Sequence, residues 1–153
     1  MKKQKLQLTQ IDLRLIAFFQ RTFIPVARFS IFLIFFWFGF IKLLGLSPAG
    51  PLAEALTAKT VGMQYFDPLF YILAAMECLI GILFLIPKTT RVVIPLLLLH
   101  MVLVCSPLIL VTSLTWQQFG VPTLEGQYII KNAVVIAIAI GIAASTKPLK
   151  SFK

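Results

Sequence analysis

The sequence has few charged side chains, and acidic ones are especially scarce. Charged residues make up 12% of the chain, whereas about 25% is usual for a soluble domain. Only 5 residues are Asp or Glu, against 14 Lys and Arg, and the net charge is +9. Because so few charges cannot hydrate the surface of a 153-residue chain that is 59% hydrophobic, a water-soluble protein is excluded.

Residues that carry most enzyme chemistry are also scarce. The chain has one histidine, His100, and two cysteines, Cys78 and Cys105, which do not form the CxxC pair of a dithiol catalyst. No phosphate-binding glycine loop, nucleophile elbow or zinc-ligand spacing occurs. We therefore expect no catalytic residue and no metal site, and two buried thiols that are not bonded to each other.

Long apolar runs are what the sequence does have. Segments of roughly 18 or more mostly apolar residues are typical of membrane spans. Four such segments cover about 28–46, 68–87, 91–112 and 127–146. The remainder is too short for a separate domain, so residues 1–153 are predicted to form one all-α integral membrane domain, an antiparallel bundle of four transmembrane helices.

The positive charges follow the predicted topology. Of the 14 Lys and Arg, 11 lie before the first span, between the second and third, or after the fourth. With four spans these three regions share one side, which the positive-inside rule assigns to the cytoplasm together with both termini. The charge is therefore explained by a lipid bilayer, and a nucleic-acid partner is excluded. No small-residue cleavage site follows the basic N-terminus, so we expect this segment to be retained.

The segments outside the spans have patterns of their own. Residues 9–23 carry a basic stripe beside an apolar one, which predicts an amphipathic helix at the cytoplasmic interface; a plain extension of the first span is the alternative. Pro51 favours a short outer-loop helix to about Lys59. The second outer loop, from about 112 to 126, is expected to be irregular. Pro107 predicts a kink or break in the third span.

The polar residues inside the spans are the candidate site. Glu77 lies near the middle of its span and needs a partner, because an unpaired charge there costs roughly 2.5–3.5 kcal/mol. From their depths we rank Lys131 or Lys42 as its first partner, with His100 next. The whole predicted cluster comprises Lys42, Glu77, His100, Glu125, Lys131 and Asn132. Such a cluster either fixes helix register or forms a ligand site, and the sequence leaves both open.

Three segments together resemble a known family. The segments "RFSIFLIFFWFGFIKLLG", "ECLIGILFLIP" and "LEGQYIIKN", spread over about residues 28–144, are similar to the DoxX-like family of small four-span bacterial membrane proteins. The resemblance implies an antiparallel four-helix bundle in the bacterial inner membrane. It also implies that Lys42, Glu77, Glu125 and Lys131 belong to a family pattern. Distant relatives use paired cysteines for disulfide chemistry, which this chain lacks.

Two functions from different classes follow from these observations. The first is a non-catalytic accessory or scaffold subunit, which holds a membrane-protein partner or a second copy of itself and needs no cofactor. The second is a quinone- or lipid-binding component of a membrane oxidoreductase system, with lysine or histidine donating to a quinone carbonyl. Because the chain has no recognisable electron carrier, we favour the first. An enzymatic role would be that of a quinone-linked oxidoreductase subunit.

The topology is directly testable. In a background without native cysteines, Lys2→Cys and Lys153→Cys should react with a membrane-impermeant maleimide only after cells are opened, because both termini are predicted to be cytoplasmic. Labelling of either terminus in intact cells would contradict the topology.

Overall fold

The computed structural model describes residues 2–148, and its side chains from residue 9 onward. Lys150 and Lys153 of the predicted cytoplasmic charges lie outside these residues. Four helical stretches are long and apolar enough to cross a membrane: Thr9–Leu43, Met63–Leu85, Pro87–Leu110 and Leu124–Ala144. The prediction of an all-α protein with four candidate membrane spans is therefore confirmed, apart from one small hairpin.

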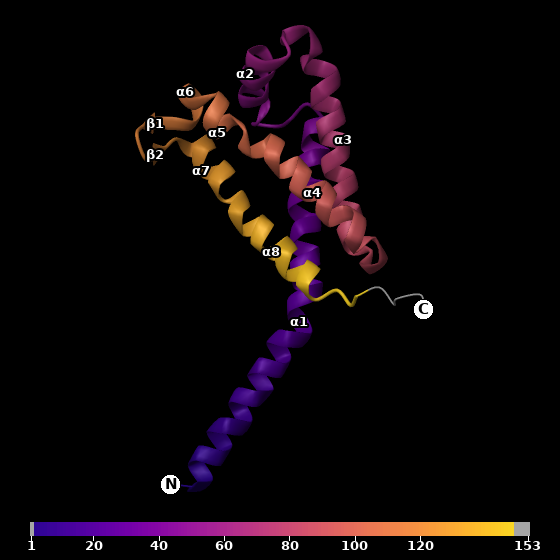
Figure 1. The fold of residues 1–153 in the computed structure, drawn as a ribbon, viewed down its shortest axis with the longest axis vertical. Helices are drawn as coiled ribbons and strands as arrows, with labels where there is room; N and C mark the ends of the chain where they lie inside the picture. Colours follow the sequence, from indigo (N-terminus) through magenta and orange to yellow (C-terminus); the bar gives the residue numbers. More distant parts are fainter. Residues whose placement is uncertain (1, 149–153) are drawn as a thin grey trace.

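The four spans run alternately up and down, as Figure 1 shows. Helix α1 (Lys2–Leu43) rises, α3 (Phe66–Leu85) returns, α4 (Thr90–Cys105) rises again, and α7 (Leu124–Ile130) with α8 (Asn132–Ala144) descends. The start of α1 and the end of α8 therefore point to the same side. We call the end of the bundle with the α3–α4 turn and the end of α8 the basic end, and the opposite end the hairpin end.

Helix α1 differs from the prediction of a separate interfacial helix. Residues 9–23 are helical as expected, but they continue without a break into the first span, with Pro25 inside a helix of 42 residues. A single proline removes one backbone hydrogen bond and bends a helix without necessarily ending it. The predicted boundary between two helices is thus wrong. The position of this segment at a membrane interface stays a prediction.

The hairpin end is built from short elements. The predicted outer-loop helix is present as α2 (Gly50–Thr60), followed by the 3₁₀ turn η1 (Met63–Tyr65). The third span breaks after Cys105, as predicted, and Pro107 begins the four-residue helix α5 (Pro107–Leu110). A second 3₁₀ turn, η2 (Pro87–Thr89), joins α3 to α4 at the basic end.

The second outer loop is more ordered than expected. It contains α6 (Thr112–Thr115) and an antiparallel hairpin of β1 (Trp116–Gln118) and β2 (Val121–Pro122). The turn of the hairpin uses Gly120 at φ +76°, a conformation that glycine adopts without strain. The Trp116 indole donates to the carbonyl oxygen of Leu108 at 2.9 Å, which ties the hairpin back to α5. The expectation of an irregular loop missed these two strands.

One buried stripe on each long helix forms the core. On α1 the stripe repeats every four residues through Ala27, Ile31 and Phe35, as helical periodicity requires for a single buried face. The corresponding buried apolar residues on the other spans are Ala74, Ile80 and Phe84 on α3, Val93, Ile94, Leu97 and Met101 on α4, and Val135, Ala139 and Ile142 on α8. The opposite faces keep large apolar side chains exposed, which suits helices surrounded by lipid.

Helices α1 and α3 make the closest contact in the bundle. An added Cβ at Gly39 would lie 2.7 Å from the carbonyl oxygen of Ala74 on α3. An added Cβ at Gly81 would lie 2.8 Å from the backbone nitrogen of Phe36 on α1. One glycine on each helix therefore lets the two backbones approach, as small residues do between membrane helices. Ala74 and Gly81 therefore lie on the face of α3 that packs closely against α1.

Substitution of these glycines should separate the helices. Gly39→Ala and Gly81→Ala each place a methyl group against backbone atoms that cannot rotate away, so each should lower the free energy of unfolding in detergent by about 1–3 kcal/mol. Gly50→Ala is the control, because an added Cβ there meets nothing within 4 Å. Equal stability of all three variants in a thermal melt would contradict the close approach.

Candidate functional site

The candidate site continues the buried stripes of three helices. Lys42 lies in the last turn of α1, seven residues after Phe35, and Glu77 lies three residues after Ala74 on α3. His100 follows Leu97 by three residues on α4. These spacings keep each polar side chain on the face that already points into the bundle. The close crossing at Gly39 then brings Lys42 and Glu77 to the same level.

Lys42 and Glu77 form a buried ion pair. The Lys42 Nζ donates to Glu77 Oε2 at 2.5 Å, and each residue is only 7% exposed. Two opposite charges at this distance cancel each other, which removes much of the cost of burying either in a membrane. Of the two partners ranked first for Glu77, Lys42 is the one that the structure provides.

His100 lies against the other oxygen of the same carboxylate. Its Nε2 is 3.5 Å from Glu77 Oε1, close enough for an ion pair if the ring is protonated but with no hydrogen bond formed. The ring packs edge-on against Phe35, with 5.6 Å between centroids, and the residue is 2% exposed. Neither ring nitrogen has a hydrogen-bond partner, and buried polar atoms normally have one. The imidazole is thus the one unsatisfied group of the cluster.

The arrangement defines what the three groups can do chemically. With a neutral imidazole the cluster has no net charge, and the remaining N–H groups of Lys42 and one imidazole N–H are donors that fit a carbonyl oxygen. With a protonated imidazole the cluster carries one extra positive charge. Among residues 9–148, no group of three or more His, Cys, Asp or Glu side chains is placed to hold a metal ion.

Three residues of the predicted cluster lie elsewhere. Lys131 is exposed, and its Nζ lies 5.0 Å from the ring centroid of Tyr128. Glu125 is also exposed, and Asn132 is half-buried at the start of α8. The buried residues of α7 are Gly126 and Ile129, and two residues beyond Ile129 along a helix the side chain points to the opposite side. Of the predicted alternatives Lys131 or Lys42, Lys131 is therefore not the partner of Glu77, because depth alone does not determine which face a residue occupies.

The described thiols are both free. Cys78 lies next to Glu77 on α3 and its Sγ is 3.7 Å from the carbonyl oxygen of Phe36, whereas Cys105 ends α4. The prediction that the two are not bonded to each other is confirmed. Both cysteines are half-buried, so the expectation of fully buried thiols is not met.

Sequence reasoning missed the role of Arg28, which it used only as a boundary marker. Its Nη1 donates to the carbonyl oxygen of Phe84 at 3.1 Å, and its Nη2 donates to the hydroxyl of Thr90. Arg28 therefore joins α1 to the end of α3 and the start of α4. The available signal was its spacing of four residues from Ile24 and three residues from Ile31, which places Arg28 beside the buried stripe.

Comparisons with protein-family models, curated proteins and solved structures give no match to this chain. The resemblance to the DoxX-like family therefore stays a prediction from the three sequence segments.

The ion pair predicts a double-mutant cycle. Glu77→Ala and Lys42→Ala should each lower the free energy of unfolding in detergent by about 3–5 kcal/mol, because each leaves the other charge buried and uncompensated. The double variant should lose clearly less than the sum. Lys131→Ala is the control: since Lys131 is exposed and outside the cluster, its effect should stay within about 0.5 kcal/mol and add to that of Glu77→Ala. Additive losses for Lys42 and Glu77 would mean that the pair does not interact.

Proposed function

We propose that this chain is a non-catalytic accessory or scaffold subunit of a membrane complex, of the DoxX-like type. We place it in the inner membrane of a bacterium, with both termini in the cytoplasm, where it holds a membrane-protein partner. The observation that supports this proposal most is the half of α1 that extends beyond the bundle. We call residues 9–26 the α1 arm.

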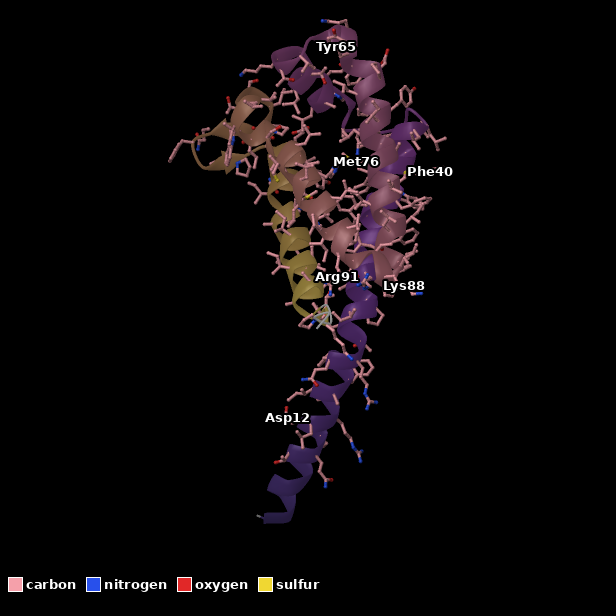
Figure 2. The ribbon with its side chains drawn as sticks, turned by 45° about the vertical axis from the view of Figure 1, so that its right-hand side comes forward. Asp12, Phe40, Tyr65, Met76, Lys88 and Arg91 are labelled. Atoms are coloured by element: carbon pink, nitrogen blue, oxygen red, sulfur yellow. The ribbon has the colours of Figure 1, made fainter. Side chains whose placement is uncertain are left out.

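The arm is long, and its contacts with the bundle are at its C-terminal end, where Ile24 packs against the core and Phe23 lies next to Gly141. At about 1.5 Å per residue, the 42 residues of α1 span about 63 Å, against about 30 Å for the 20 residues of α3. Figure 1 shows the excess as a helix that leaves the basic end, and in Figure 2 Asp12 lies well below the bundle. A helix of this length without a packed partner is a surface that another molecule can cover.

The arm has the residue pattern of a docking helix. Its exposed apolar side chains include Ile11 at 55%, Phe18 at 58% and Phe19 at 63%. Ile11 and Phe19, eight residues apart, lie on one broad apolar face, and Phe18 lies at the edge of this face beside Arg14 and Arg21, which are four and three residues away. Asp12, seven residues before Phe19, falls within the apolar face, where a carboxylate is unfavourable against an anionic lipid surface. A protein partner with a basic group suits this face better than lipid alone.

The closed polar cluster supports a structural role over a catalytic one. Lys42, Glu77 and His100 are each 7% exposed or less, and the lysine and the carboxylate neutralise each other. Such a pair can fix the register of two helices, which is the best-attested use of buried polar groups in bundles. A scaffold requires that kind of rigid platform beneath a projecting arm.

A second candidate is a quinone- or lipid-binding component of a membrane oxidoreductase system. The specific observation in its favour is that both nitrogens of the buried His100 ring lack hydrogen-bond partners. A quinone carbonyl oxygen would accept from such a ring, and Lys42 offers a second donor at the same level. In this role electrons would come through another subunit.

One purification distinguishes the two candidates. Full-length chain extracted from native membranes in mild detergent should run as a complex with a stoichiometric protein partner. Phe18→Ser with Phe19→Ser on the arm should release the partner, because these two are its most exposed aromatic side chains. The control is Ile72→Ser with Leu99→Ser, which removes two similarly exposed apolar side chains from the bundle, 62% and 70%.

The outcomes are separate for each candidate. Loss of the partner in the arm variant alone supports the scaffold. A chain that runs without any partner protein contradicts it. Stoichiometric quinone in the organic extract of the wild type, absent from His100→Phe at unchanged melting temperature, would favour the second candidate instead.

A further inference from the structure

The basic end of the bundle contains two adjoining hollows. The first, of about 390 Å³, lies between α1, the α3–α4 turn and the end of α8. The second, of about 420 Å³, lies between α4 and the residues that follow α8. Thr90 and Thr146 line both, so the two hollows meet. Neither belongs to the central cluster of Lys42, Glu77 and His100.

Positive side chains line these hollows. Arg28 lines the first, and Arg91 and Lys147 line the second. Figure 2 shows Lys88 at the same end of the molecule as Arg91. No Asp or Glu lines either hollow among residues 9–148: Asp12 is sixteen residues before Arg28 on the same helix, about 24 Å away, and Glu77 is already paired with Lys42. The positive charge therefore has no acidic partner along these walls.

The arginines are held in place with donors to spare. Arg28 uses Nη1 and Nη2 for Phe84 and Thr90, and Arg91 donates through Nη2 to the carbonyl oxygen of Lys147 at 2.6 Å. A guanidinium has five N–H groups, so each arginine keeps donors for an anion. The first turn of the 16-residue helix α4, which begins at Thr90, adds the partial positive charge of a helix N-terminus.

The rest of the lining is apolar and favours a lipid as the source of that anion. Ile24 and Pro25 line the first hollow, and Ile94 and Pro95 line the second. A free inorganic phosphate gains nothing from such walls, whereas a phospholipid can place its phosphate at the arginines and its glycerol and first methylenes against them. Basic pockets between membrane helices at the cytoplasmic surface bind the headgroups of anionic lipids in this way.

We propose that these two hollows form a binding site for the phosphate group of an anionic phospholipid, with Arg28, Arg91 and Lys147 as its cationic contacts. The site adjoins the proposed partner-binding arm, because Ile24 and Pro25 line the first hollow, but the proposal does not rest on partner binding. Arg28 forms the wall between bundle and arm, and Arg91 and Lys147 face the anion from α4 and the end of α8.

Native mass spectrometry of the full-length chain tests the site. The probes are phosphatidylglycerol, phosphatidylcholine and inorganic phosphate, added to the detergent-purified protein. Wild type should retain phosphatidylglycerol in preference to phosphatidylcholine. Arg91→Gln with Lys147→Gln should weaken phosphatidylglycerol binding about tenfold or more, since each juxtamembrane cation contributes to anionic-lipid affinity. Lys59→Gln with Lys131→Gln removes the same charge at exposed positions outside the hollows and should leave binding unchanged.

Other results would overturn the proposal. Equal weakening by both double variants would mean non-specific attraction to net charge, and equal retention of the two lipids would mean no anion site. Displacement of phosphatidylglycerol by millimolar inorganic phosphate would assign a free phosphate as the ligand. Lys147→Gln alone guards against misfolding, because the Arg91 bond uses the backbone of Lys147; it should weaken binding severalfold at an unchanged melting temperature.

Discussion

The close crossing of α1 and α3 is the constraint on which the rest of this structure depends. Lys42 and Glu77 can form a hydrogen-bonded ion pair at 2.5 Å only if the two backbones approach at the same level. Gly39 and Gly81 permit that approach, since a methyl group at either would meet backbone atoms. The ion pair and the glycines therefore need each other: a wider crossing would leave two charges buried and unpaired, at a cost that a membrane helix pair cannot easily sustain.

Arg28, a second cation on α1, also contacts α3. It lies fourteen residues before Lys42, which is about 21 Å along the helix axis at about 1.5 Å per residue. Arg28 donates to the carbonyl oxygen of Phe84, near the end of α3, and to Thr90 at the start of α4. Helix α1 is thus fixed to α3 at two heights, with the glycine contacts between them. N-terminal to Arg28, Ile24 still packs against the core and the ring of Phe23 lies next to Gly141 on α8, and the arm leaves the bundle beyond these residues.

The spans, the outer-loop helix and the break at Pro107 could be predicted from the sequence, because the length of an apolar run and the position of a proline determine local structure. Sequence reasoning also identified Glu77 as the residue that needs a partner, from the cost of a lone charge. The sequence could not decide between Lys42 and Lys131 as the partner of Glu77, because both have the right depth and only the packed structure shows which face each occupies. The junction between α7 and α8 turns Lys131 outward over Tyr128. The small hairpin was not predicted either, because strands of three and two residues are too short to show the alternation of a β-strand.

The position of Arg28 connects the features that would otherwise look independent. The same guanidinium that fixes α1 to the α3–α4 turn forms a wall of the first basic hollow, and Pro25, three residues before it, lines that hollow where the arm begins. An anion bound there would draw on the free donors of Arg28 without breaking its bonds to Phe84 and Thr90. It would also contact Ile24 and Pro25, the residues of the arm nearest the bundle. Occupancy of the hollow and the direction of the arm should therefore be coupled, through contacts to one side chain rather than through the distant central cluster.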